Sequence, residues 1–422
     1  MRSSKDCGEP AGPSRVSAVR ILRLASGGDG VGKLADGRAV FVPRTAPGDL
    51  TELASLRAHK RFARARVARL LEAGPARVEP RCPHYVRDEC GGCQLQHLEP
   101  AAQREARRAF VGDAFRRIAR REVGDPEIEP SDREYDYRTK ITLAVSADGR
   151  RIGLHRYDRA DQVFDLHWCH ITVPDLMELW QALRHLRAHL PPRLATIVLR
   201  RDRDGGRHVV FRTTAGEAWS GGPRLHAELG RRSQAATIWW QPEDGVPRAV
   251  AGAGEAYPAT VFEQVHPAMG DRVRSHAVAA LGEVAGRHVW DLYAGLGETT
   301  VALAEAGASV ESVEADWRAV AEAEARGPAA RRHAARVEHV VGELEPPDLV
   351  ITNPPRTGMD GRVTEALDRL RPARMVYVSC DPATLARDLT RLPAFRVAEL
   401  KAFDLFPQTA HVETVAVLEP AP

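Results

Sequence analysis

A single cysteine near the C-terminus stands where a reactive thiol is expected. Cys380 follows the apolar run 375–379 (MVYVS), and Asp381 and Pro382 break the extended chain before a helical pattern begins near Thr384. Open α/β sheets carry their chemistry at such strand ends, and the N–H groups of the next helix lower a thiol's pKa. A buried structural cysteine suits the position equally well, because cysteine is among the most buried residue types.

A second group of cysteines has the spacing of a metal site. The segment 82–93 reads CPHYVRDECGGC, and Gly91 and Gly92 allow the backbone to wrap so that two thiolates can reach one centre. A fourth ligand is supplied, by elimination, from the segment DLHWCHI. Four thiolates suit either zinc or an iron–sulfur cluster, and a structural zinc site is the simpler alternative. The ligand set would be Cys82, Cys90, Cys93 and Cys169.

A glycine-containing turn and a later carboxylate predict a nucleoside site. The apolar run 288–292 leads into the turn 293–297 (YAGLG), and the following apolar run ends in Glu314. Gly295 and Gly297 let the backbone approach a nucleoside, and the carboxylate accepts from ribose hydroxyls. Without GxGxxG or a Walker lysine, S-adenosylmethionine fits better than NAD or ATP. The alternative is that these glycines only form a turn.

The elements that carry these residues follow from the order of the apolar patterns. From 268 to 418 strand and helix patterns alternate, which predicts a doubly wound, Rossmann-like sheet. Short strands with one helix near 174–190 predict an α+β middle domain. We therefore expect a disordered tail (1–15), a small barrel (16–72), a middle domain with the cysteine site (73–258) and a catalytic domain (259–422). A helix over 99–121 could pack on the catalytic domain.

The N-terminal part has the features of a small RNA-binding barrel. Asp36-Gly37 between two apolar runs indicates a hairpin, and SGGDGVGKLADGRAVFVPRTAPGD resembles the TRAM domain, an OB-like barrel. Residues 1–124 hold 24 Lys and Arg against 14 Asp and Glu, whereas the remainder holds 36 against 43. A basic front half suits a polyanion such as RNA, and the alternative is ordinary solvated charge in an Arg-rich chain.

Taken together, the motifs resemble the RNA 5-methyluridine (uracil-C5) methyltransferase family over nearly the whole chain. The stretches that carry the resemblance are CGGCQLQH (90–97), FEQV (262–265), DLYAGLG (291–297), NPPRTG (353–358), YVSCDPATLARDL (377–389) and DLFPQTAHVETVAVL (404–418). The resemblance implies that Cys380 is the nucleophile and Glu413 the general base. It implies cofactor contacts from Gln264, Tyr293, Glu314 and Asn353, and a [4Fe–4S] cluster on the four cysteines named above.

The chemistry of uracil agrees with these roles. Its C5 atom is too weak a nucleophile to take a methyl group directly, but a thiolate added to C6 makes C5 enolate-like. A base must then remove the C5 proton so that elimination frees the enzyme. If the final strand is antiparallel, Glu413 near its start would lie by Cys380.

Four departures from the family pattern accompany the resemblance. The family usually has Asp where Asn353 stands, and Asn where Glu298 stands, a position that contacts the cofactor. It favours Asn in place of His266, and five residues between the first two cysteines where this chain has seven. These changes bear on cofactor affinity and loop geometry more than on reaction type.

We therefore predict an RNA uracil-C5 methyltransferase that uses S-adenosylmethionine and acts on ribosomal or transfer RNA, as a monomer in the cytoplasm. The sequence contains no run of about 18 apolar residues, so we predict no membrane span. No secretory signal is expected. One alternative is a catalytically weak RNA-binding or chaperone protein, motivated by Glu298 and Asn353. Another is an RNA cytosine-C5 methyltransferase, which would carry a second active-site cysteine.

Overall fold

The computed structural model describes residues 18–214, 219–232, 234–252, 263–327 and 330–422. The chain divides into two compact units, one of Met1–Glu79 with His97–Glu99, the other of Pro80–Gln96 with Pro100–Pro422. The predicted tail (1–15) and the predicted boundary between residues 258 and 259 lie outside the described residues. None of the helices in the described ranges is long and apolar enough to cross a membrane.

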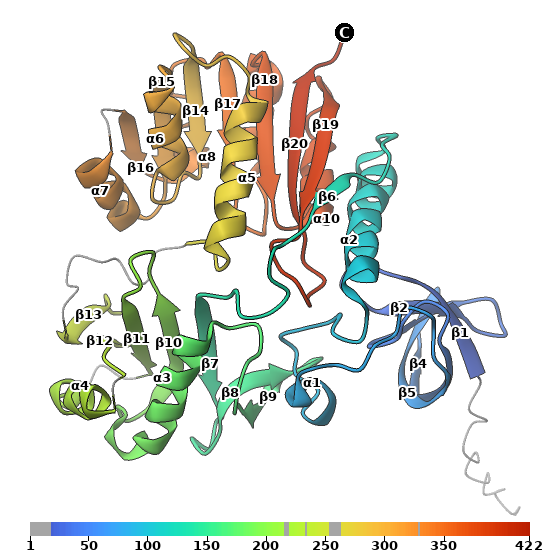
Figure 1. The fold of residues 1–422 in the computed structure, drawn as a ribbon. Helices are drawn as coiled ribbons and strands as arrows, with labels where there is room; N and C mark the ends of the chain where they lie inside the picture. Colours follow the sequence, from blue (N-terminus) through green and yellow to red (C-terminus); the bar gives the residue numbers. More distant parts are fainter. Residues whose placement is uncertain (1–17, 215–218, 233, 253–262, 328–329) are drawn as a thin grey trace, which may run out of the picture. The chain divides into compact units, whose positions relative to one another are not determined.

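The first unit is a closed five-stranded barrel, as the short strand patterns predicted. Its strands are β1 (Ala18–Leu24), β2 (Gly30–Lys33), β3 (Ala39–Val42), β4 (Leu50–Ala58) and β5 (Phe62–Glu72), joined in the order β1-β2-β3-β5-β4 (Figure 1). Alternate residues of these strands fill the interior, among them Val19, Ile21, Val40 and Val42. The fully buried Asp49 pairs with Arg77 at 2.6 Å, which ties the segment after β5 to the barrel.

The second unit contains two sheets, of which the first is seven-stranded with the order β13-β12-β11-β10-β7-β8-β9. Its strands are β7 (Lys140–Val145), β8 (Ile152–Arg156), β9 (Arg159–Asp165), β10 (Leu194–Arg201), β11 (Arg207–Thr213), β12 (Thr237–Gln241) and β13 (Arg248–Ala251). Helices α3 (Pro174–His185) and α4 (Gly222–Arg231) pack on one face, where Trp180, Leu229 and Phe211 belong to one core. The short α1 (Pro83–Arg87) lies within the cysteine segment, and the 3-10 turn Arg187–His189 follows α3.

The second sheet is eight-stranded and has the order β16-β15-β14-β17-β18-β20-β19-β6. Strands β14 (His288–Leu292), β15 (Ser309–Glu314), β16 (Arg331–Ala334), β17 (Leu349–Thr352) and β18 (Arg374–Ser379) are parallel. Strands β20 (Glu413–Pro420) and β19 (Phe395–Phe403) add antiparallel, which confirms the expected direction of the final strand. The sequence did not predict β6 (Glu127–Glu129), which pairs with β19.

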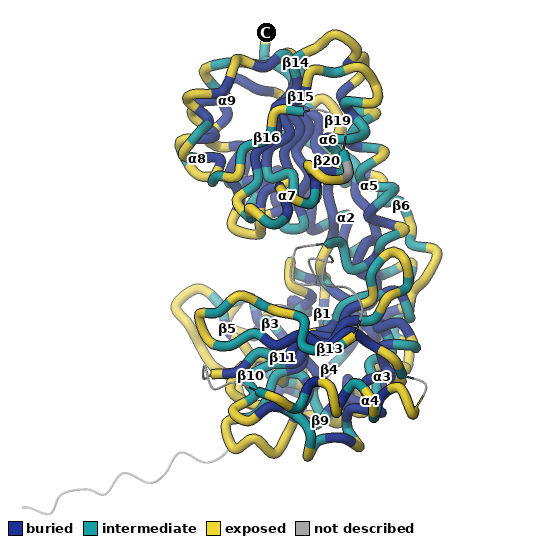
Figure 2. The backbone as a smooth tube through the Cα atoms, turned by 90° about the vertical axis from the view of Figure 1, so that its left-hand side faces the viewer, coloured by how far each residue is buried: buried dark blue, intermediate teal, exposed yellow. Residues whose placement is uncertain are grey.

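Helices cover both faces of this sheet, as expected for a doubly wound fold. Met375 and Tyr377 of β18 contribute to the core under one face, whereas Val376 and Val378 contribute to the other. The first face carries α2 (Pro100–Ala114), the π-helical turn Phe115–Ala119, α8 (Val337–Val340), α9 (Gly361–Leu370) and α10 (Pro382–Leu389). The second carries α5 (Pro267–Ala280) and α6 (Glu298–Glu305), and α7 (Trp317–Arg326) joins β15 to β16. Figure 2 shows the central strands buried between these layers.

Candidate active site

Cys380 comes directly after β18, at the carboxyl edge of the parallel strands. The next residue, Asp381, caps α10, because its carboxylate accepts from the backbone N–H groups of Ala383 and Thr384, each at 2.9 Å. This cap fixes the chain direction immediately after the thiol. The strand, the turn and the helix therefore lie as the sequence predicted, and Cys380 is partly exposed at their junction.

Glu413 stands opposite Cys380 across the pair of strands β18 and β20. Ser379 pairs with Thr414 in this antiparallel ladder, so the next residue on each strand brings Cys380 and Glu413 together. Glu413 is 1% exposed, and its Oε2 atom has no hydrogen-bond partner among the described residues. Burial raises the pKa of the Glu413 carboxyl to about 8. The site therefore places a thiol next to a carboxyl group whose pKa lies well above the ordinary value for glutamate.

Arg356 lies beside both groups, and sequence reasoning did not give it this role. Burial raises the pKa of the Cys380 thiol and the charge of Glu413 adds to the rise, whereas the guanidinium of Arg356 lowers this pKa by its charge and a hydrogen bond. The same guanidinium opposes the burial effect on the pKa of Glu413. The sequence did contain a signal for this role, because Arg356 follows the end of a predicted strand in the segment NPPR.

The turn after β14 and the end of β15 lie together where the sequence predicted a nucleoside site. Tyr293, Gly295 and Gly297 have φ angles of +62°, +57° and +74°, a left-handed region that glycine adopts without strain. The carboxylate of Glu314 accepts from the backbone N–H groups of Gly295 (2.9 Å) and Asp316 (2.8 Å). Each carboxylate oxygen keeps acceptor capacity for a ribose hydroxyl.

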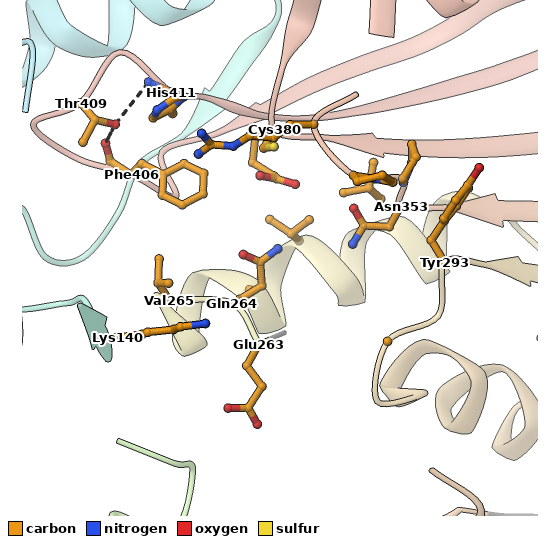
Figure 3. A pocket seen from close by; sticks show the side chains of 18 of the residues that line it. Lys140, Glu263, Gln264, Val265, Tyr293, Asn353, Cys380, Phe406, Thr409 and His411 are labelled. Atoms are coloured by element: carbon orange, nitrogen blue, oxygen red, sulfur yellow. Dashed lines mark hydrogen bonds between the residues drawn. The ribbon is translucent and has the colours of Figure 1, made fainter. Parts of the chain in front are cut away.

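Gln264 and Asn353 line the same cavity. In Figure 3, Tyr293, Asn353 and Cys380 follow one another along the ends of the adjacent strands β14, β17 and β18, and Gln264 approaches from the segment before α5. Gly270 makes room for Gln264, because a Cβ at Gly270 would lie 2.9 Å from the Cβ of Gln264. The cavity measures about 1590 Å³, and both the thiol of Cys380 and the turn after β14 border it.

Two of the departures from the family pattern have a structural explanation. The carboxylate of Glu298 pairs with Arg274 and, at 2.9 Å, with Arg203, so its charge is compensated at the edge of the cavity. His266 caps α5, shares a hydrogen bond of 2.9 Å with Ser131 and stacks on Tyr137. Burial lowers the pKa of His266 to about 4, so it is a neutral packing residue.

The four predicted metal ligands border one cavity in the second unit. Cys82, Cys90 and Cys93 are buried, and Cys169 is partly exposed. Burial raises the pKa of the Cys93 thiol well above its ordinary value, and the charges of the other three cysteines add to the rise. Within the described ranges, no three His, Cys, Asp or Glu side chains are arranged to hold a single metal ion.

Asp291 and His411 also border the cavity, and sequence reasoning gave them no role. Asp291 accepts from the hydroxyl of Thr300 at 2.6 Å, and burial raises its pKa to about 6. Partial desolvation and the charges of Arg356 and Arg138 lower the pKa of His411, an exposed residue, to about 4. Both residues lie inside the motifs quoted above, and the surroundings that shift their pKa values follow only from the tertiary structure.

Comparison with known proteins identifies the family. The family model for tRNA (uracil-5-)-methyltransferase matches residues 318–421, and the TRAM domain model matches residues 14–68. A 23S rRNA (uracil(1939)-C(5))-methyltransferase RlmD of Thiobacillus denitrificans is 32% identical over 95% of this chain and 99% of its own length. The chain belongs to the RNA uracil-C5 methyltransferase family.

Other relatives agree with this membership. The RlmD of Azoarcus is 31% identical over 94% of this chain and 98% of its own length. Among solved structures, a Pyrococcus abyssi tRNA (uracil-54, C5)-methyltransferase in complex with S-adenosyl-L-homocysteine is 25% identical, has a TM-score of 0.72 and covers 95% of this chain and 99% of its own. Family membership confirms the TRAM domain, the Rossmann-like methyltransferase fold and the expected enzyme class, and it supports S-adenosylmethionine as the methyl donor.

Proposed function

We propose that this protein methylates C5 of a uridine in RNA through a covalent adduct on Cys380. The observation that carries the proposal is the position of Cys380 opposite the buried Glu413, at the carboxyl edge of a sheet whose neighbouring strand ends form the nucleoside site. Gln264, Tyr293, Gly295, Gly297, Glu298, Glu314 and Asn353 would bind the cofactor.

S-adenosylmethionine supplies the electrophilic methyl group. The Cys380 thiolate adds to C6 of a uridine that has left its stack, which puts electron density on C5. When C5 has taken the methyl group, Glu413 in its carboxylate form accepts the C5 proton. The electrons of the C5–H bond form the C5–C6 double bond, and the Cys380 thiolate leaves. Arg356 favours both anionic forms.

We propose ribosomal RNA as the substrate, because the two RlmD relatives are named for 23S rRNA and match nearly the full length of this chain. The N-terminal TRAM barrel would supply an electrostatic contact with that RNA. A monomer in the cytoplasm is consistent with this substrate and remains a prediction. Of the two departures that motivated the RNA-binding alternative, Glu298 and Asn353, the charge of Glu298 is compensated by two arginines.

We propose further that Cys82, Cys90, Cys93 and Cys169 hold a [4Fe–4S] cluster. Cys93 is buried, and Cys90, Cys169 and Cys82 all lie close enough for their charges to act on its thiol, so the four sulfur atoms could share one centre. A [4Fe–4S] cluster takes four cysteine thiolates, and these four cysteines border one cavity.

The proposed mechanism is tested with two variants that should fail at different steps. Cys380→Ala should abolish methyl transfer and give no covalent complex. Glu413→Gln keeps the nucleophile and blocks proton removal, so a methylated RNA–protein complex should survive a denaturing gel. Cys380→Ser provides a matched control for the volume of the side chain. Near-normal activity of Cys380→Ala would show that this thiol is structural and would overturn the proposal.

A further inference from the structure

The turn between β19 and β20 determines where Glu413 lies. This turn (residues 404–412) joins two antiparallel strands, and Phe403 at the end of β19 pairs with Glu413 at the start of β20. Within it, the Thr409 hydroxyl donates to the carbonyl of Phe406 at 2.8 Å and accepts from the N–H of His411 at 3.2 Å (Figure 3). A change in the turn would therefore be transmitted directly to Glu413.

The middle of the turn has an unusual backbone conformation. Gln408 has a φ angle of +70° and is 2% exposed. L-residues other than glycine rarely adopt this region, and they persist there only when their surroundings impose it. Glycine would adopt this conformation without strain. The presence of glutamine instead indicates that the structure uses its side chain at this position.

Gln408 is held by hydrogen bonds from two distant segments. Gln103 of α2 forms a reciprocal pair with it, because Gln103 Oε1 accepts from the Gln408 N–H and Gln103 Nε2 donates to Gln408 Oε1, both at 3.0 Å. The carbonyl of Gln408 accepts from the N–H groups of Gln94 (3.2 Å) and Leu95 (3.0 Å). The Gln94 side chain also accepts from the N–H of Ala410 at 3.2 Å.

Arg107 of α2 also holds the turn, as does Tyr137, whose hydroxyl donates to the carbonyl of Pro407 at 2.9 Å. The Arg107 side chain is 1% exposed, donates to the carbonyl of Thr409 at 2.8 Å and pairs with the buried carboxylate of Asp404 at 2.8 Å. Removing one partner of such a buried pair leaves an uncompensated charge. Gln103, Arg107 and Gln408 do not border the catalytic cavity within the described residues, so they do not touch the reacting groups, whereas Gln94 does border it.

We propose that Gln94, Gln103 and Arg107 are positioning residues for the proposed base, Glu413, which they align by fixing Gln408. The inference rests on the proposed function. Cys380 is held by β18 and by the Asp381 cap of α10; α10 packs on α2, but none of the hydrogen bonds to Gln408 reaches Cys380. Loss of the contacts to Gln408 should therefore slow removal of the C5 proton while addition of the thiolate continues.

The experiment compares Gln103→Ala with Glu105→Gln, an exposed position on the same helix. RNA tritiated at C5 of the target uridine reports proton removal, and a denaturing gel reports the covalent complex. We expect Gln103→Ala to slow tritium release about 10-fold to 100-fold and to accumulate the complex. Glu105→Gln should behave as the unaltered protein. Gln103→Glu keeps the acceptor for the Gln408 N–H and should be intermediate.

Gln103→Met keeps the side-chain volume and removes the hydrogen bonds, so it provides a second test in case Gln103→Ala folds poorly. If complex formation and tritium release fall in parallel, with no accumulation, Gln103 only supports packing and the inference is wrong. The Glu413→Gln variant distinguishes an error in the positioning inference from an error in the proposed role of Glu413. Accumulation with Glu413→Gln alone would overturn the inference and leave the function intact, whereas no accumulation with Glu413→Gln would overturn the role of Glu413 itself.

Discussion

The backbone N–H of Gly295 donates a hydrogen bond of 2.9 Å to the carboxylate of Glu314, which joins the turn after β14 to the end of β15. Parallel strands β14 and β15 are neighbours, so this bond closes the carboxyl edge of the sheet at the place where an open α/β fold binds a nucleoside. Glu314 thus stabilises the turn, and in the proposed function its remaining acceptor capacity would bind the ribose of the cofactor.

Replacing Glu314 should weaken cofactor binding. In Glu314→Ala the hydroxyls of the ribose lose their acceptor and the N–H of Gly295 loses its partner, so we expect binding of S-adenosylmethionine to weaken by about 1–3 kcal/mol. Isothermal titration calorimetry measures the change. Glu314→Gln retains one acceptor oxygen and should lose less. Equal affinity of all three proteins would remove Glu314 from the cofactor site.

Protein purified without oxygen should be brown and contain iron and acid-labile sulfide in about equal amounts, as a [4Fe–4S] cluster requires. Cys93→Ser should lose most of the colour, because it removes one of the buried thiolates. The exposed Glu105→Gln variant should keep it. A colourless protein with one zinc per chain would contradict the cluster and favour a structural zinc site.

The N-terminal barrel should contribute salt-dependent RNA affinity. Arg57, Lys60 and Arg61 are exposed around the connection between β4 and β5, where His59 stacks on Phe62 at 4.5 Å. Changing the three basic residues to Gln should reduce the slope of log affinity against log salt by about 2, since each phosphate contact contributes about 0.7 on a single strand. Arg69→Gln, at a position paired with Glu52, is the control. An unchanged slope would place the RNA contact elsewhere.

The order of apolar runs was sufficient to predict the barrel and the doubly wound sheet. Asp36-Gly37 marks a local turn, and polar residues lie at or directly after the ends of β15, β17 and β18, namely Glu314, Asn353 and Cys380, so local signals indicate much of the topology. The position of Cys380 opposite Glu413 required one further assumption, the direction of β20, which the structure confirms.

Features that depend on partners distant in sequence escaped prediction. Strand β6 has only three residues, and its pairing with β19 follows from where the chain passes rather than from its own pattern. Arg107 and Asp404 form their buried pair from segments nearly three hundred residues apart. The many arginines between residues 99 and 121 favour a solvated or RNA-facing helix surface, but Arg107 is buried at 1% exposure. Its environment is set by the turn at 404–412, which no helical periodicity reveals.

The raised pKa of Glu413 predicts how the last step of the reaction depends on pH. Burial disfavours the carboxylate and raises the pKa to about 8, so below that pH the group is mostly protonated and cannot accept the C5 proton. Release of tritium from C5 should therefore rise about tenfold per pH unit below pH 8 and level off above it. Single-turnover measurements on a preformed covalent complex isolate this step from addition of the Cys380 thiolate.

Replacing Arg356 tests whether Glu413 is the group whose titration gives this pH dependence. The Arg356 guanidinium lowers the pKa of both Glu413 and Cys380, so Arg356→Met should move the rise in tritium release, and separately the rise in adduct formation, to higher pH. Arg362→Met, in an exposed arginine of α9 that pairs with Asp360, should leave both profiles in place. A flat profile for tritium release between about pH 6 and pH 9 would mean that Glu413 does not titrate in the complex, and another group would then have to accept the proton.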